Sequence, residues 1–284
     1  PGEFVSLNKH FIEKLQQIEL LTEQQEDARI IHEAHAAAFE ALTEDLEQIE
    51  KDESWSKQVN LFREPAPDID LSGLKAELRS YQTDGIQWLN RLAHWGLGAC
   101  LADDMGLGKT IQAIGILISR SKLGPQLVIA PTSVCYNWEL EILKFAPSLS
   151  PKLLSEYNRQ DLINNCGNGD IIIASYGLLQ HAGMLLKDKD WGTIILDEAQ
   201  AIKNSKTKRA KMALQLKSDC RICLTGTPIE NHLHELWSIF QFLNPGFLGN
   251  HTQFMKKFIK PIELLQDNQS TAVLKQLINP FVLR

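Results

Sequence analysis

The sequence predicts an α/β protein with a doubly wound, mostly parallel sheet, preceded by a small helical region. Beyond about residue 74, short continuous apolar runs alternate with longer segments whose apolar residues recur at helical spacing. The short runs do not alternate apolar with polar residues, which is typical of parallel strands buried on both faces. Strand, helix and strand repeated in this way favour a layered domain with right-handed crossovers.

The composition is that of a folded chain without a membrane span. Of the 284 residues, 44% are hydrophobic and 23% are charged, as in ordinary globular proteins. Apolar runs stay below the roughly 18 to 20 residues that a bilayer-spanning helix needs, so we expect no membrane partner. The five cysteines are scattered and odd in number. We therefore expect buried thiols in a reducing, intracellular setting, cytoplasmic or nucleoid if the source is prokaryotic.

Residues 5–62 are predicted to form an acidic, helical accessory region. The stretch 6–49 lacks Pro and Gly and repeats apolar residues at helical spacing, among them Ile30, Ile31 and Ala34, so we expect two or three helices. Residues 1–72 carry 17 acidic and 6 basic side chains, a net charge of −11, whereas residues 73–284 carry 18 acidic and 23 basic, a net charge of +5. A docking role for a protein partner and a plain solvated surface are both open readings of these helices.

A linker at 63–73, which contains two prolines, separates this region from a domain at 74–284. Strands are predicted there at 99–102, 126–130, 152–155, 170–175, 193–196 and 221–225. Helices are predicted between them at 110–118, 138–145, 177–186, 206–216 and 233–243. We expect residues 244–284 to form a helical protrusion at the end of this domain.

The first chemical signal is the stretch Leu101–Thr110, L-A-D-D-M-G-L-G-K-T, which follows a predicted strand. Phosphate-binding loops read G-x-x-x-x-G-K-[ST], with the Lys on phosphate oxygens and the hydroxyl on Mg²⁺. Here Lys109 and Thr110 match, but Asp103 stands where the first glycine is expected. A strand-to-helix turn that needs glycine for positive φ is the competing reading. The stretch lies beyond the carboxyl end of its strand, where open α/β sheets bind ligands.

Two further strand ends carry polar residues. The run I-I-L-D-E-A-Q places Asp197 and Glu198 at the end of an apolar strand, where one carboxylate can hold Mg²⁺ and the other can orient and deprotonate water. The run L-T-G-T-P-I-E-N ends another strand. We expect the strand before Asp197 to neighbour the strand before the glycine-rich loop.

In this order, these elements resemble the first RecA-like lobe of a helicase superfamily-two motor, specifically a Swi/Snf-related DNA translocase ATPase. The resemblance covers about residues 74–284, and in this family the loop itself reads D-[DE]-M-G-L-G-K-T, so Asp103 fits it. Three more segments agree: Leu78–Leu89, Pro131–Glu141 and Asn279–Arg284. Ser80 and Gln200 depart from the residues that many members carry, Pro and His respectively.

The resemblance implies roles for individual residues. The catalytic residues are Lys109, Asp197 and Glu198, and the metal ligands are Thr110 and Asp197. The nucleotide is bound by Gln82, Asp104, Met105, Gly106, Leu107, Gly108, Lys109 and Thr110, with Gln82 on the base edge. Nucleic acid is contacted by Thr132, Ser133, Asn137, Trp138, Ser175, Tyr176 and Lys203. Hydrolysis is coupled to movement through Gln200, Thr225, Gly226, Thr227 and Pro228.

It also implies a function: a hydrolase that uses ATP and Mg²⁺ to track along double-stranded DNA, helicase-like and similar to chromatin-remodelling motors. A second RecA-like lobe in cis, which residues 1–284 do not include, would bring arginines to the γ-phosphate. We therefore expect this chain alone to be inactive or weakly active. The alternatives are a non-catalytic nucleic-acid or protein interaction module on the same fold, and a helicase that separates strands.

Overall fold

The computed structural model describes residues 18–25, 28–36, 39, 53–104, 106–155, 159–226 and 233–284. The chain divides into two compact units. The sheet unit comprises Ala66–Pro245 and Ile278–Arg284, and the hairpin unit comprises Pro1–Pro65 and Gly246–Leu277. Residues 246–277 thus group with the N-terminal region, although the sequence suggested that they extend the sheet domain.

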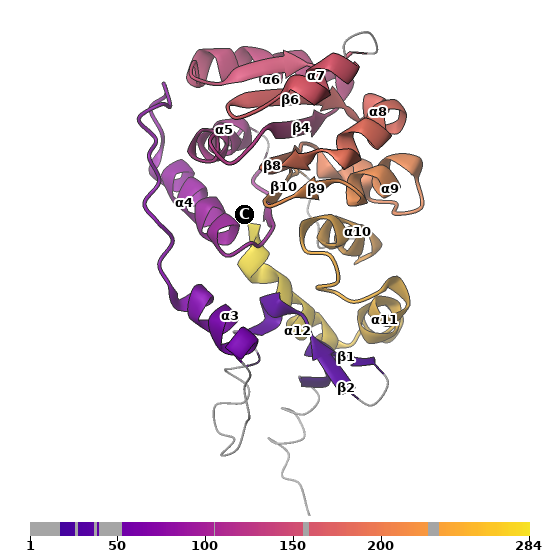
Figure 1. Cartoon of the computed structure of the whole chain (residues 1–284). Coiled ribbons are helices and arrows are strands. Elements are labelled where there is room, and N and C mark those ends of the chain that lie inside the picture. Colours follow the sequence, from indigo (N-terminus) through magenta and orange to yellow (C-terminus); the bar gives the residue numbers. More distant parts are fainter. Residues whose placement is uncertain are drawn as a thin grey trace, which may run out of the picture. The chain divides into compact units, whose positions relative to one another are not determined.

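The sheet unit is built on seven strands in the order β11-β3-β10-β8-β4-β6-β5 (Figure 1). Every neighbouring pair is parallel, which confirms the predicted fold class. Their bounds are β3 Ala99–Leu101, β4 Gln126–Ala130, β5 Ser150–Leu153, β6 Asp170–Ser175, β8 Thr193–Leu196, β10 Arg221–Leu224 and β11 Val282–Leu283. Strands β3, β4 and β8 are buried along their whole length, as their continuous apolar runs require.

Helices cover both faces of this sheet (Figure 1). On one face α5 contacts both α4 and α6, and on the other α9 contacts both α8 and α10. The bounds of the helices are α4 Ser80–His94, α5 Lys109–Ser119, α6 Thr132–Phe145, α7 Arg159–Asn165, α8 Tyr176–Asp188, α9 Lys208–Leu214 and α10 Leu233–Leu243. Among the described residues, no helix is both long and apolar enough to cross a membrane.

The helices change faces between the neighbouring strands β3 and β10. Helix α5 follows β3 and packs with α4 and α6, whereas α10 follows β10 and packs with α9. In open α/β sheets, ligands bind beyond the carboxyl ends of strands at such a reversal. The glycine-rich loop follows β3 and Thr225 follows β10, so the topology brings both to this place.

Three predicted strands, at 126–130, 170–175 and 193–196, have the observed bounds, and the other three differ only at their ends. One predicted neighbour was wrong: β10 lies between β3 and β8, so the loop and Asp197 are not on adjacent strands. The sequence did not predict β11, or the pair β7 Asp190–Trp191 and β9 Lys217–Ser218. Strands of two residues are too short to leave a periodic pattern.

The hairpin unit corrects the helical prediction for residues 22–25 and 28–31, whereas residues 18–21 are helical. Strands β1 Thr22–Gln25 and β2 Ala28–Ile31 pair antiparallel, with Thr22 opposite Ile31. The β-branched Ile30 and Ile31 favour a pleated strand over a helix. The unit also contains η1 Glu33–His35, α3 Glu53–Arg63, α11 His251–Phe254, a π-helix η4 Met255–Leu264, and α12 Asn268–Ile278, which η5 Asn279–Phe281 follows in the sheet unit. The other residues of the predicted stretch 6–49 lie largely outside the described part of the chain.

Candidate nucleotide site

The glycine-rich loop runs from β3 into the first turn of α5. Gly106 and Gly108 have φ of 85° and 79°, a left-handed backbone that favours glycine. Asp103 is not among the residues with positive φ, which explains how an aspartate can stand where other phosphate loops carry glycine. Asp103 is buried, and its Oδ2 accepts a hydrogen bond from Gln112 Nε2 at 3.2 Å. Met105, predicted to contact nucleotide, lies outside the described residues.

The Lys109 side chain is held at the loop. Its Nζ donates to the backbone oxygens of Asp103 at 2.6 Å and of Asp104 at 3.1 Å. These acceptors are uncharged, so an anionic phosphate oxygen would be a stronger partner for the ammonium group. Arg284 approaches the exposed carboxylate of Asp104 at 3.7 Å, and exposed pairs of this kind contribute little to stability.

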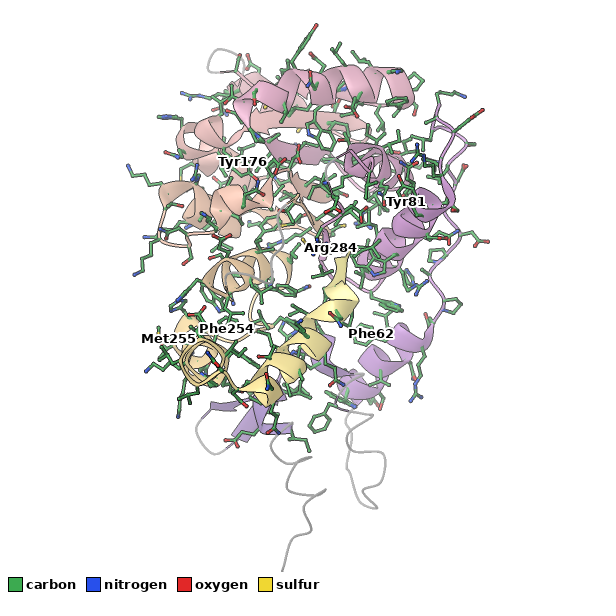
Figure 2. The ribbon with its side chains drawn as sticks, turned by 180° about the vertical axis from the view of Figure 1, so that it is seen from behind. Phe62, Tyr81, Tyr176, Phe254, Met255 and Arg284 are labelled. Carbon is green, nitrogen blue, oxygen red and sulfur yellow. The ribbon has the colours of Figure 1, made fainter. Side chains whose placement is uncertain are left out.

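Helix α4 lies against the loop, as predicted for the element that contains Gln82. Gln82 Nε2 and the Tyr81 hydroxyl both donate to Leu107 O, at 3.2 and 3.1 Å. Gln82 Oε1 accepts from Arg79 N at 3.0 Å and so helps to cap the start of α4. Tyr81 can be located on α4 in Figure 2. Gln82 is thus placed at the loop, and its contact with a base stays a prediction.

Asp197, the residue after β8, is held by four hydrogen bonds. Its backbone N–H donates to Ile129 O and its backbone oxygen accepts from the Tyr176 hydroxyl, both at 2.8 Å. Its carboxylate accepts from Trp138 Nε1 at 2.8 Å on Oδ2 and from Glu198 N at 2.9 Å on Oδ1. Each carboxylate oxygen has two lone-pair sites and accepts one of these hydrogen bonds. The second site on each oxygen can ligate a hard cation.

Burial is the main cause that raises the pKa of the Asp197 carboxyl above its ordinary value, and the neighbouring Glu198 raises it further. The hydrogen bond from Trp138 opposes this shift because it stabilises the charged form. A divalent cation beside the carboxylate would act in the same direction as Trp138. The oxygen donors of Asp197 and Thr110 are the type that Mg²⁺ prefers, so the residues fit the predicted metal.

A chain of hydrogen bonds joins the ends of β10 and β8. The Thr225 hydroxyl donates to Gln200 Oε1 at 3.0 Å, and Gln200 Nε2 donates to Glu198 Oε2. Glu198 has a φ of 50°, a left-handed conformation that costs a non-glycine residue about 1–2 kcal/mol. The surrounding contacts therefore hold Glu198 in an unfavourable backbone state. Gly226 follows Thr225, whereas Thr227 and Pro228 lie outside the described residues.

The residues expected to contact nucleic acid separate into two groups. Thr132, Ser133 and Asn137 are exposed on α6. Lys203 is exposed as well and pairs with Glu235 at 2.9 Å. These four remain candidates for phosphate contacts.

In the other group the side chains turn inward, and their contact with nucleic acid stays a prediction. Trp138, Ser175 and Tyr176 are only 2%, 8% and 6% exposed. Ser175 caps α8 by accepting from Leu178 N at 3.2 Å, and the two aromatic side chains bind Asp197 instead of facing solvent. Tyr176 can be found in Figure 2 at the start of α8.

The contacts of Trp138 and Tyr176 with Asp197 were not predicted, although a signal existed. Buried Trp and Tyr side chains require partners for their N–H and O–H groups. Helix α8 begins directly after β6, and β4, which precedes α6, neighbours β8. Strand order was needed to identify the partner. Gln112, described above on the buried side of the loop, was also missed.

Comparison with known proteins agrees with this geometry. The family model of the SNF2-related domain matches residues 81–284. A putative ATP-dependent helicase/translocase of Bacillus subtilis is 47% identical over 217 residues, 74% of this chain and 24% of that protein. A TATA-binding protein-associated factor of Saccharomyces cerevisiae is 36% identical over 239 residues, 74% of this chain and 13% of that protein. The chain thus spans a quarter or less of these relatives.

A solved Sulfolobus solfataricus SWI2/SNF2 ATPase core in complex with double-stranded DNA has a TM-score of 0.71 and 45% identity. The match covers 76% of this chain and 46% of that one. The core domain of the same ATPase gives a TM-score of 0.66 and 44% identity, over 76% of this chain and 44% of that one. Because the family model matches well over half of the sequence, this chain belongs to the SNF2-related domain family, as its motifs predicted.

Proposed function

We propose that this chain is the ATP-binding first lobe of an ATP-dependent motor that translocates on double-stranded DNA. The observation that carries the proposal is the convergence of three strand ends: the Lys109 loop after β3, the Asp197–Glu198 pair after β8, and Thr225 after β10, with Gln200 joining the last two. A glycine turn alone would need neither the paired carboxylates nor the bridge.

Nucleotide binding falls to the loop and α4. The N–H groups at the start of α5 can receive phosphate oxygens, and Gly106 and Gly108 allow the backbone to approach them closely. In this proposal the Lys109 ammonium exchanges two backbone oxygens for phosphate oxygens. Gln82 lies beside Leu107 and belongs to α4, the helix that is proposed to contact the base.

Thr110 and Asp197 would hold Mg²⁺, which when bound neutralises phosphate charge as it develops in phosphoryl transfer. Trp138 and Glu198 N hold the two carboxylate oxygens of Asp197 in a fixed orientation. A ligand held in advance loses little entropy on binding. The metal contact therefore depends on residues from α6 as well as on the strand end.

Glu198 is proposed to orient the attacking water and accept its proton. Gln200 donates to Glu198 Oε2, which fixes the carboxylate and leaves Oε1 for the water. Since Gln200 also accepts from Thr225, a movement of the segment after β10 would shift the Glu198 carboxylate. This is the proposed link between hydrolysis and movement, in which Gly226, Thr227 and Pro228 would take part.

Duplex DNA is the proposed track. Support comes from the exposed Thr132, Ser133 and Asn137 on α6, and from a 45% identical ATPase core solved with double-stranded DNA. A second RecA-like lobe in cis is the proposed source of the arginines, which in related hydrolases contribute about 10³–10⁵ in turnover. We further propose an intracellular protein, whose N-terminal region regulates the lobe or docks on a protein partner.

The test compares wild type, Lys109→Ala and Glu198→Gln. ATP affinity is measured on residues 1–284, and phosphate release is measured with and without duplex DNA on a protein that joins this lobe to a second one. We expect Lys109→Ala to weaken ATP binding by about 100-fold or more, because it removes the cation on the phosphates. Glu198→Gln should retain ATP binding and lose about 10²–10⁴ in turnover.

Residues 1–284 alone should release little phosphate, with or without DNA, because the proposed arginines are not among them. Turnover that survives Glu198→Gln would remove Glu198 as the base. A wild-type two-lobe protein that binds DNA and releases no phosphate would reject the enzyme and leave the non-catalytic interaction module. DNA-dependent turnover accompanied by release of a labelled strand would identify the strand-separating helicase.

A further inference from the structure

Two glutamine–glycine contacts join α4 to the glycine-rich loop and α5. The Gln82 amide of α4 lies over Gly108, where a Cβ atom would stand 2.5 Å from Gln82 Nε2. The Gln112 amide of α5 lies over Gly85 of α4, where a Cβ atom would overlap Gln112 Oε1 and stand 3.1 Å from its Cδ. Each helix therefore presents a glutamine to a glycine of the other segment.

A buried amide at position 112 costs free energy of desolvation, so its presence calls for a structural or functional reason. Its side chain is fully buried, and Oε1 has no hydrogen-bond partner in the described part of the chain. Its Nε2 donates to the buried Asp103 carboxylate at 3.2 Å. The reverse orientation of the amide would place two acceptors together, so Asp103 determines that Oε1 faces Gly85.

We infer that Gln112 is a positioning residue that fixes α4 against the glycine-rich loop and thereby sets selectivity for the adenine base. Asp103 orients the Gln112 amide, the amide determines how closely Gly85 approaches, and Gly85 lies three residues after Gln82 on the same helix. The position of Gln82 relative to Leu107 thus depends on Gln112. The inference rests on the proposed ATP site and adds a residue that contacts no nucleotide.

Gly85 is the sensitive point of this arrangement. An alanine there would push the Gln112 amide away from Asp103, since the overlapping atom is the end of a flexible side chain and can rotate. If Gln112 is shortened to alanine, the same methyl group has space. The two substitutions should therefore be strongly non-additive.

The experiment measures binding of ATP, GTP and tripolyphosphate to residues 1–284, together with thermal unfolding. The variants are Gln112→Met, which keeps the shape and removes both hydrogen-bonding atoms, Gly85→Ala, Gln112→Ala and the double variant Gly85→Ala/Gln112→Ala. Gly177→Ala in α8 is the matched control, because the nearest atom to its Cβ would be Ser175 Oγ at 3.6 Å.

We expect Gln112→Met and Gly85→Ala to lower the ratio of ATP to GTP affinity by about tenfold, the effect of losing one hydrogen bond. Tripolyphosphate, which has no base, should bind as tightly as to wild type. The double variant should select no worse than Gln112→Ala alone, and Gly177→Ala should match wild type.

An unchanged ATP to GTP ratio in a folded Gln112→Met protein overturns the inference and leaves the proposed ATP site intact. Equal losses for ATP, GTP and tripolyphosphate also overturn it, because they indicate general damage to the loop. A wild-type chain that binds neither ATP nor tripolyphosphate removes the proposed function and the inference together.

Discussion

The two units differ in the hydrogen bonds that they give to an ionisable side chain, half-buried Asp197 in one unit and buried His35 in the other. In the sheet unit, both carboxylate oxygens of Asp197 accept hydrogen bonds and its backbone is bonded on both sides. In the hairpin unit, His35 is 4% exposed and bonds through Nδ1 to Leu21 O at 3.2 Å, while the buried Nε2 has no partner within the described residues.

This difference concerns how far each unit offsets the cost of removing a charge from solvent. The Asp197 site supplies donors that favour a carboxylate, although burial opposes it. At His35, burial and then the nearby His32 lower the pKa from 6.5 to about 4. The hydrogen bond to Leu21 O opposes this shift, and Lys257 adds to it. Burial disfavours the charged form at both sites, but both carboxylate oxygens of Asp197 accept hydrogen bonds, whereas His35 Nε2 has no partner within the described residues.

As the pH falls, the hairpin unit should open at a higher pH than the sheet unit. This is the largest effect that we expect. The pKa of His35 is lower in the folded chain, so the unfolded chain binds more protons between pH 6.5 and about 4. The stabilisation is complete above pH 6.5 and falls by about 3 kcal/mol as the pH drops to 4. Peptide-resolved hydrogen exchange at pH 7.5 and pH 5 measures this in peptides of 28–36 and of 126–130.

The control is His35→Phe, which keeps a ring beside Phe247, now 4.4 Å from the His35 ring centroid, and cannot titrate. Its peptides should lose the acid-dependent opening that wild type shows. Equal acid sensitivity in both proteins would place the cause outside His35.

Removing one hydrogen-bond donor to the Asp197 carboxylate should weaken its binding of a cation. Trp138→Phe keeps a buried aromatic ring and deletes the N–H that donates to Oδ2. Hydrogen bonds to charged groups contribute about 1.5–3 kcal/mol, so we expect the Mg²⁺-dependent part of ATP binding to weaken by about tenfold. Titration of ATP at several Mg²⁺ concentrations measures this.

Tyr136→Phe is the matched control, since Tyr136 is 59% exposed on the same helix. It should behave as wild type. If Trp138→Phe binds ATP with an unchanged Mg²⁺ dependence, Trp138 packs against Asp197 without orienting it.

Sequence reasoning succeeded where a local pattern fixes the structure. Runs such as Gln126–Ala130 and Asp170–Ser175 are short, mostly apolar on both faces and lie between helical patterns, which favours a buried parallel strand. The residues Lys109, Asp197 and Thr225 could be placed at strand ends for the same reason. Motifs identified these positions, and the strands determined which end of the sheet they occupy.

It failed where the outcome depends on neighbours in space. Trp138 and Tyr176 belong to segments expected to contact nucleic acid, yet the direction of each side chain follows from the position of β8 beside β4. Gln112 reads as one more residue of an apolar helix until Asp103 and Gly85 surround it. Ile30 and Ile31 match helical spacing, but β-branching and pairing with β1 override that period.

The smallest effect should come from the neutral end of the hydrogen-bond chain. Thr225→Val deletes the hydroxyl that donates to Gln200 Oε1 and keeps the volume of the side chain. A neutral hydrogen bond contributes about 1 kcal/mol, so thermal unfolding should detect a modest loss, and ATP affinity should be unchanged. Thr225→Ser retains the hydroxyl and should restore most of the loss.

The valine variant should also affect turnover. In Thr225→Val, Gln200 has one contact fewer to hold its amide nitrogen on Glu198 Oε2, so turnover in a two-lobe protein should fall about fivefold. Equal turnover in the valine and serine variants would show that Thr225 does not act through Gln200, and would leave the Asp197 contacts as the part of the site that is held in advance.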